Sequence, residues 1–290
     1  MRIRKSLMIT AIAAASVLGL GACAGGGDPA PEPPAAAPEF EAGTTMAKLA
    51  DAGTITIGTK FDQPLFGLKG PSGDPVGFDV EIGKLIASAL GISADKIEWV
   101  ETVSKNREPF IENGTVDIVV ATYTINDARK EVVSFAGPYY NAGQDILVLD
   151  GNPEGITGPE DLAGKNVCSV AGSTSEKNIA EYGVNLITTD TYSNCLEPLR
   201  QGKVIAVTTD NVILAGLADQ NAGEFEVISN PFTEEPYGIG LGHDDDAFRD
   251  FINDVLEKSY ADGSWKAAWE ATAGKVLKTP EPPAVNRYTN

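Results

Sequence analysis

DIVVATYTINDARKEVVSFAGPYY, residues 117–140, is the stretch that decides the fold of this chain. It opens with an apolar run, residues 118–121, which is typical of a buried parallel strand. Thr122 and Thr124 follow, and Arg129 comes shortly afterwards. Because a guanidinium can bind both oxygens of a carboxylate and hydroxyls add directed donors, this strand end predicts a site for a small carboxylate. The alternative from this stretch alone is a surface arginine in a turn.

Strands and helices alternate on both sides of that stretch. Before it, the patterns predict a strand, a helix, a strand and a helix in turn, at residues 54–58, 76–91, 97–100 and 105–113. This order predicts a parallel sheet with helices on both faces. After residue 143 comes a second and smaller set, with a strand at 144–149, a helix that starts at 159–162, a strand at 166–170 and further helices and strands. Two C-terminal helices close the chain. We therefore expect an α/β fold of two lobes joined by two hinge strands, with a ligand cleft between the lobes.

The expected organisation has four parts. Residues 1–22 have a basic start and a short apolar core, which is typical of a signal peptide. Small residues then precede Cys23, as in the lipobox of bacterial lipoproteins, so we expect a lipid on Cys23; a plain signal peptide with an incidental cysteine is the alternative. Residues 23–45 are predicted to be a disordered tether. Lobe 1 is expected at 46–142 plus 239–290, and lobe 2 at 143–238.

The charge of the chain limits its partners. The formal net charge is −19, and loss of the three basic residues in the signal peptide would bring it to −22. Such acidity argues against nucleic acid or an anionic membrane surface as a partner. Any site for an anionic ligand must therefore be built locally.

Cysteine and histidine usage points to export and away from metal chemistry. Cys168 and Cys195 form an even pair that predicts a disulfide in an oxidising compartment; two buried thiols are the alternative. The sequence has no CxxC motif, and His243 is its one histidine. We expect no metal and no cofactor.

Several blocks together resemble family 3 of the extracytoplasmic solute-binding proteins, which serve polar amino-acid ABC transporters. The blocks are GFDVEIG at 77–83, TYTINDAR at 122–129, FAGPY at 135–139, and GKNV at 164–167 leading to Gly172-Ser173-Thr174. The sequences KFDQP at 60–64 and SKNREPF at 104–110 are similar to the glutamate-binding lipoproteins of single-membrane bacteria. The resemblance implies a type II periplasmic-binding-protein fold.

The resemblance also implies residue roles. It assigns the α-carboxylate of an amino-acid ligand to Arg129 and Thr174, with Thr122 and Thr124 as the small residues beside Arg129; Ser173 is a further candidate ligand-binding residue. A helix N-terminus at Ser173 would favour the same anion, and a plain helix cap is the alternative there. The resemblance assigns the α-ammonium to Asp210, for which an N-cap is the alternative.

Lys60 and Arg107 lie where acidic-amino-acid-binding relatives carry cations, so they predict a second carboxylate on the ligand. Solvated surface cations are the alternative. Phe61 matches an aromatic residue of the cleft wall, or is a core residue.

These observations predict a lipid-anchored, monomeric protein outside the cell membrane that captures an acidic amino acid, glutamate first, and delivers it to an ABC permease. The alternatives are binding of aspartate, glutamine or asparagine, and an amino-acid sensor with another partner. A secreted dehydratase-like enzyme is a third alternative. We do not expect an enzyme, because the sequence offers no nucleophile beside a base and no acid–base histidine in the cleft.

Overall fold

The computed structural model describes residues 38–288. The predicted signal peptide and Cys23 lie outside these residues, as does most of the predicted tether. The part of the tether that is described reaches α1 (Thr45–Ala52), and its Phe40 ring packs edge-on against Phe251 with 5.5 Å between centroids. This aromatic contact places the end of the tether against the folded domain.

The first sheet holds the stretch at residues 117–140. Its strands, in spatial order, are β4 (Ile97–Glu101), β1 (Ile55–Thr59), β5 (Ile118–Thr124), β12 (Glu235–Leu241) and β6 (Ser134–Ala142). β4, β1 and β5 run parallel, and β12 is antiparallel to both β5 and β6. Every residue of β5 is buried, as expected for an apolar strand covered on both faces.

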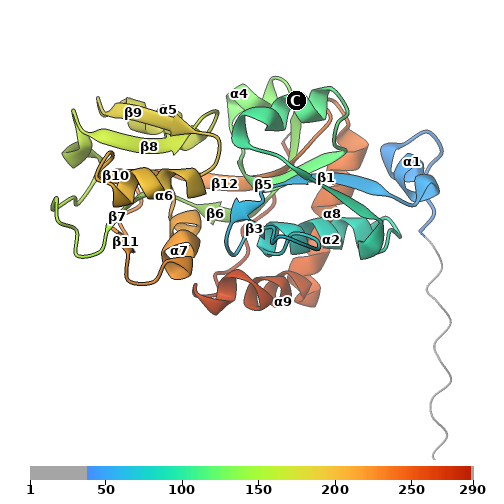
Figure 1. Ribbon diagram of the computed structural model, residues 1–290. Helices are drawn as coiled ribbons and strands as arrows, with labels where there is room; N and C mark the ends of the chain where they lie inside the picture. Colours follow the sequence, from blue (N-terminus) through green and yellow to red (C-terminus); the bar gives the residue numbers. More distant parts are fainter. Residues whose placement is uncertain (1–37, 289–290) are drawn as a thin grey trace, which may run out of the picture. The chain divides into compact units, whose positions relative to one another are not determined.

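Helices cover both faces of this sheet, as the strand and helix order predicts. Ile118 and Val120 of β5 belong to the cluster that also holds the buried residues of α2 (Phe78–Ala89), α8 (Asp246–Asp262) and α9 (Ser264–Ala271). Val119 and Tyr123 belong to a second cluster, with α3 (Arg107–Glu112). In Figure 1, α2, α8 and α9 lie on one side of the sheet and α4 (Asp127–Lys130) on the other. Period-two alternation along β5 therefore separates the two layers.

The second sheet forms the smaller lobe. Its strands, in spatial order, are β11 (Phe225–Val227), β7 (Gln144–Leu149), β10 (Ala206–Asp210), β8 (Asn166–Val170) and β9 (Asn185–Thr189). The helices that follow β8, β9 and β10 along the chain are α5 (Thr174–Ala180), α6 (Ser193–Arg200) and α7 (Asn211–Gln220). The predicted α/β fold with two lobes is confirmed.

Two crossings join the lobes. β6 ends in the first sheet at Ala142 and β7 begins in the second at Gln144, so Gly143 alone separates them. A Cβ on Gly143 would lie 2.8 Å from the carbonyl oxygen of Thr233, on the returning segment. The two crossing segments therefore pack closely because this residue has no side chain. The exact limits of the lobes stay a prediction.

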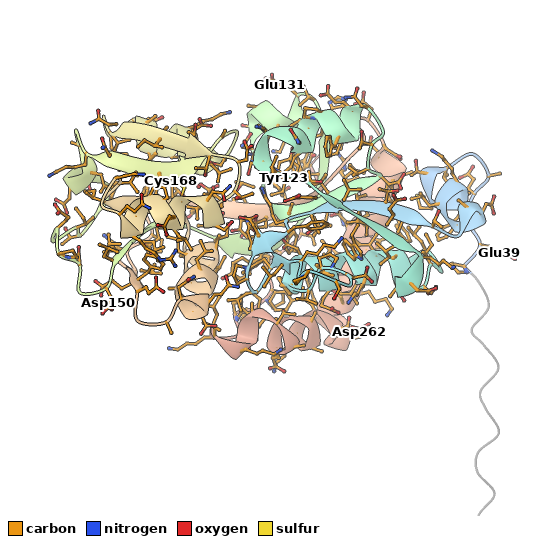
Figure 2. The ribbon with its side chains drawn as sticks, viewed as in Figure 1. Glu39, Tyr123, Glu131, Asp150, Cys168 and Asp262 are labelled. Atoms are coloured by element: carbon orange, nitrogen blue, oxygen red, sulfur yellow. A yellow bond between two sulfur atoms is a disulfide. The ribbon has the colours of Figure 1, made fainter. Side chains whose placement is uncertain are left out.

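The predicted disulfide is present. Cys168 of β8 and Cys195 of α6 are bonded, with 5.7 Å between their Cα atoms, and Figure 2 labels Cys168 in the smaller lobe. The bond ties a helix to the sheet on which it packs. Across residues 38–288, no helix is both long enough and apolar enough to cross a membrane.

Most element boundaries fall within two residues of the predicted ones, and one hairpin was not predicted. β2 (Asp62–Gln63) and β3 (Gly67–Leu68) pair antiparallel inside the loop after β1. Residues 159–162, predicted to start a helix, form a single 3₁₀ turn (Pro159–Leu162). α2 ends where expected, because Gly91 takes the left-handed conformation with a φ of 79°.

Candidate ligand-binding site

A small cavity lies where the C-terminal ends of β5 and β10 meet the N-terminal ends of α5 and α7. The cavity volume is about 10 Å³ in this structure, far below the roughly 300–1,000 Å³ of sites for drug-sized ligands, because the side chains of the two lobes nearly fill it. Its lining residues are Ser104, Arg107, Thr122, Thr124, Ser173, Thr174, Ser175, Tyr192, Thr209, Asp210 and Ile213. Both lobes contribute to this list.

Asp210 supplies the negative charge of the cavity. The Tyr237 hydroxyl donates a hydrogen bond to Asp210 Oδ2 at 2.6 Å, whereas the buried Oδ1 has no partner among the described residues. Burial, followed by the nearby Glu235, raises the pKa of Asp210 to about 7. Asp210 occupies the N-cap position of α7, but its side chain makes no capping bond. The helix-cap alternative therefore does not account for this carboxylate.

Two buried cations, Lys60 and Arg107, meet at Ser104; Arg107 lines the cavity, whereas Lys60 does not. Lys60 Nζ donates to Ser104 Oγ at 2.9 Å, and Arg107 donates from Nε to the Ser104 carbonyl at 3.2 Å. Each residue is only 3 % exposed, and neither forms an ion pair with a carboxylate of the described chain. Burial, followed by Arg107, lowers the pKa of Lys60 to about 7. The surface-cation alternative is wrong for both residues, because both are buried.

Arg129 lies beside the cavity rather than in its lining. Its guanidinium donates from Nε to Glu108 Oε1 at 3.0 Å and from Nη1 to the Thr124 carbonyl at 2.7 Å. Nη2 reaches the Gly172 carbonyl of the other lobe at 3.3 Å. Burial, followed by Arg107, lowers the pKa of Arg129 to about 10. Arg129 is buried, so the alternative of a surface arginine is wrong. The role of Arg129 as a carboxylate clamp stays a prediction.

Thr122 is held in an unusual conformation by the GFD block. Its φ is 44°, which is rare for a β-branched residue, and its N–H donates to Asp79 Oδ2 at 2.8 Å. The Tyr139 hydroxyl donates to the other oxygen of Asp79 at 2.6 Å. Asp79 therefore fixes the bend that turns Thr122 into the cavity.

The second lobe contributes the start of α5. Ser173 Oγ accepts from the Glu176 N–H at 2.9 Å, so Ser173 caps this helix. Glu176 Oε2 accepts from the N–H of Gly172 at 2.7 Å, whereas in a capping box it would accept from the N–H of Ser173. Thr174 donates its hydroxyl to Glu235 Oε2 at 2.8 Å. Ser173 and Thr174 both line the cavity, as the sequence predicts, with Thr122 and Thr124 opposite.

Phe61 is not brought to the cavity. It is half-buried, and Lys69 Nζ lies 4.6 Å from its ring centroid. Five lining residues were missed: Ser104, Ser175, Tyr192, Thr209 and Ile213. Ser104 opens the SKNREPF block and Thr209 directly precedes Asp210, so both could have been predicted as site residues from their neighbours in the sequence. Tyr192 and Ile213 follow no local pattern that marks them.

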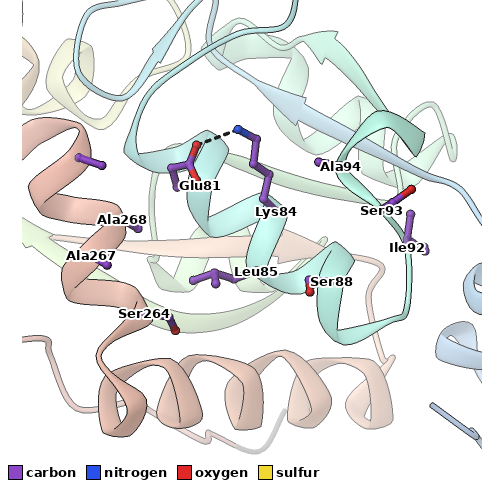
Figure 3. Close-up of a pocket in the computed structure, with 11 residues that line it drawn as sticks. Glu81, Lys84, Leu85, Ser88, Ile92, Ser93, Ala94, Ser264, Ala267 and Ala268 are labelled. Atoms are coloured by element: carbon purple, nitrogen blue, oxygen red, sulfur yellow. Dashed lines mark hydrogen bonds and ion pairs between the residues drawn. The ribbon is translucent and has the colours of Figure 1, made fainter. Parts of the chain in front are cut away.

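A larger surface cavity lies between α2 and α9, remote from these residues (Figure 3). Small and apolar side chains dominate it, including Leu85, Ile92 and Ala268. Its two charged residues, Glu81 and Lys84, pair with each other at 2.8 Å, as Figure 3 shows. This cavity therefore offers no unpaired charge with which to recognise an amino acid.

His243 lies outside the site. Its Nδ1 is 2.9 Å from Asp244 on the turn before α8. Within the described part of the chain, no group of three or more histidine, cysteine or acidic residues is arranged to hold a metal ion.

Comparison with known proteins places this chain in a family. The sequence model of the bacterial extracellular solute-binding proteins, family 3, matches residues 55–271. The chain is 42% identical over 240 residues to the glutamate-binding protein GluB of Corynebacterium efficiens, covering 79% of this chain and 81% of that protein. It is 40% identical to the ABC transporter glutamine-binding protein GlnH of Bacillus subtilis, covering 76% and 81%.

The fold agrees with solved structures. A solute receptor for L-cysteine of Neisseria gonorrhoeae superposes with a TM-score of 0.77 at 30% identity, covering 83% of this chain and 99% of that chain. The resemblance inferred from the sequence blocks is thus confirmed, and so is the type II periplasmic-binding-protein fold. This chain belongs to the bacterial extracellular solute-binding proteins, family 3.

Proposed function

We propose that this protein captures an acidic amino acid, L-glutamate, outside the cell membrane and delivers it to an ABC importer. The observation that carries the proposal is the charge arrangement of the cavity. Asp210, which has a buried carboxylate oxygen without a partner among the described residues, and Arg107 both line the cavity, and buried Lys60 is bonded to the lining residue Ser104; neither cation has a carboxylate partner in the described chain.

The α-ammonium and α-carboxylate groups, together called the amino-acid head, are assigned to residues of opposite charge. The α-ammonium can donate to Asp210 Oδ1, which supplies the acceptor that a buried ammonium requires. The α-carboxylate is assigned to Arg129, Thr122, Thr124, Ser173 and Thr174. Three of the five N–H donors of Arg129 are engaged, so ligand binding would use the others or replace the bond to Gly172.

The side chain of the ligand is assigned to Lys60 and Arg107. Burial of a cation without an opposite charge is costly, and a ligand carboxylate would remove that cost. Arg107 lines the cavity directly, and Lys60 lies behind Ser104. The likeness to GluB supports glutamate, and the likeness to GlnH makes glutamine the competing ligand to test.

The delivery step and the anchor are proposals of the same kind. The B. subtilis relative is named as part of an ABC transporter, which supports an importer as partner.

A lipid on Cys23 would hold the monomer at the membrane through the tether at residues 23–45. Metabolic labelling with a fatty acid tests the anchor, because Cys23→Ser would abolish the label. Binding without turnover predicts that bound ligand is recovered chemically unchanged.

Isothermal titration of two variants tests the ligand assignment. Lys60→Met and Arg107→Met should each weaken glutamate by about 1–3 kcal/mol, and glutamine by much less, because a neutral amide loses less charge-assisted bonding. Lys96→Met is the matched control, since it removes a cation from the exposed surface. Equal loss for glutamate and glutamine, or no loss, contradicts the assignment.

Arg129→Ala tests the head. It should weaken every amino-acid ligand alike, by about 2–5 kcal/mol, because a desolvated charge pair loses one partner. A variant that binds within a few-fold of the wild type would show that the clamp is misassigned.

A further inference from the structure

Both arginines assigned to the ligand lie against one aromatic ring. The Cζ atom of Arg107 lies 4.3 Å from the centroid of the Tyr123 ring, and that of Arg129 lies 4.9 Å from the same centroid. Figure 2 labels Tyr123 near the centre of the first sheet. An aromatic face attracts a cation within about 6 Å, and the attraction is larger where the groups are desolvated. Arg107 and Arg129 are 3 % and 6 % exposed.

The ring is itself fixed by its surroundings. Tyr123 is fully buried, and the Phe135 ring packs edge-on against it with 4.8 Å between centroids. Gly240 of β12 makes the room: a Cβ there would lie 2.7 Å from Cε1 of Tyr123 and 2.8 Å from Cδ1 of Ile111. A ring held in this way can hold its two cationic neighbours at a fixed spacing.

The hydroxyl of Tyr123 takes no direct part. It is buried and has no hydrogen-bond partner among the described residues. Burial raises the pKa of the phenol far above its usual value, so the group stays neutral. The attraction for both guanidinium groups therefore comes from the ring face, and phenylalanine would provide it too.

We propose that Tyr123 is a specificity-determining positioning residue, which sets the distance between the two guanidinium groups and thereby the length of dicarboxylate that the site accepts. This inference rests on the proposed binding of an acidic amino acid. Arg129 is assigned to the α-carboxylate and Arg107 to the side-chain carboxylate. Glutamate and aspartate differ by one methylene between those carboxylates, so a fixed spacing separates them.

The test compares glutamate and aspartate binding by calorimetry for the full domain and its variants. Tyr123→Phe keeps the ring and should bind glutamate within about threefold of the wild type. Tyr123→Leu removes the ring; glutamate affinity should fall at least about tenfold and aspartate affinity by less, so that the preference for glutamate narrows. Val119→Ala, which opens a cavity in the same apolar cluster, should change neither affinity nor preference.

A second variant displaces the ring without removing it. Gly240→Ala places a methyl group against Tyr123 and should narrow the preference in the same direction as Tyr123→Leu. It keeps the test decisive if the leucine variant does not fold. Equal loss for glutamate and aspartate in Tyr123→Leu and Gly240→Ala overturns the inference, as does a phenylalanine variant as weak as leucine. A wild-type protein that binds neither ligand refutes the proposed function instead.

Discussion

The hydroxyl of Tyr237 donates to Asp210 Oδ2 at 2.6 Å, across the boundary between the two sheets. Tyr237 lies on β12 of the first sheet, and Asp210 ends β10 of the second. The bond leaves the other carboxylate oxygen of Asp210 buried and without a partner in the described chain. The same residue therefore joins the lobes and presents an acceptor to the cavity.

Replacement of that carboxylate should abolish recognition of the amino-acid head. Asp210→Asn should weaken every α-amino-acid ligand by about 2–5 kcal/mol, because the buried ammonium loses its counter-charge. Calorimetry measures the loss. Asp145→Asn is the matched control: Asp145 is also buried in the second sheet, with an oxygen that lacks a partner among residues 38–288, but it does not line the cavity. Normal binding by Asp210→Asn would remove Asp210 from the site.

A glycine in α7 should control closure of the lobes. A Cβ on Gly216 would lie 2.6 Å from the carbonyl oxygen of Pro64, in the loop after β1. Gly216→Ala should therefore weaken ligand binding, since the lobes could not approach to this distance. Alanine is also about 1 kcal/mol better than glycine inside a helix, so the ligand-free protein should keep or gain unfolding free energy.

The matched control for Gly216→Ala is Gly242→Ala, where a Cβ meets no atom within 4 Å. Calorimetry and urea denaturation together separate the two effects. Unchanged affinity in Gly216→Ala would show that the contact with Pro64 does not limit closure.

The unfolding free energy of the ligand-free protein should have opposite pH slopes on the two sides of neutrality. Asp210 has a pKa of about 7 in the folded protein, so between about pH 4 and 7 its carboxyl keeps a proton there. The same carboxyl has lost its proton in the unfolded chain, so the unfolding free energy falls as pH rises. Lys60 also has a pKa of about 7 in the folded protein, so above pH 7 its amine loses a proton there. In the unfolded chain the Lys60 ammonium keeps that proton, so the unfolding free energy rises again as pH rises.

Variants isolate the two slopes in urea titrations at pH 5, 7 and 9. Asp210→Asn should lessen the fall below pH 7, and Lys60→Met should lessen the rise above it. Profiles parallel to the wild type in both variants would show that neither group has a perturbed pKa.

Reduction of the disulfide should destabilise the smaller lobe. Cys168 and Cys195 are 27 residues apart, and a cross-link closing a loop of this length contributes roughly 3–4 kcal/mol on the chain-entropy model. Paired Cys168→Ala and Cys195→Ala changes should lower the unfolding free energy by a similar amount. A loss below about 1 kcal/mol in denaturant titrations would contradict this.

Local signals predicted the elements well where they were strong. β7 (Gln144–Leu149) and β8 (Asn166–Val170) have the predicted bounds, because each is an apolar run closed by turn residues. The β2–β3 hairpin has only two residues a strand and carries no periodic pattern. Family blocks identified most of the residues that line the cavity. Phe61 does not line it, since its ring lies against Lys69, and its role at the cleft wall stays a prediction.

Side-chain contacts between separate helices, strands and loops could not be predicted. The ring of Tyr123 beneath two arginines, the bond from Lys60 to Ser104 and the bond from Tyr237 to Asp210 each join different secondary-structure elements, so they depend on how these elements pack together. The residue types can be read from the sequence, but neither amino-acid composition nor hydrophobic periodicity specifies which side chains will meet in the folded protein.

The most direct test of the account is one calorimetric titration of the wild-type domain at pH 7 against glutamate, aspartate, glutamine and asparagine. The charges of the cavity predict tightest binding to glutamate, with both amides weaker because they leave Lys60 and Arg107 without a counter-charge. Glutamine binding as tightly as glutamate, or no binding of any of the four, would contradict the account.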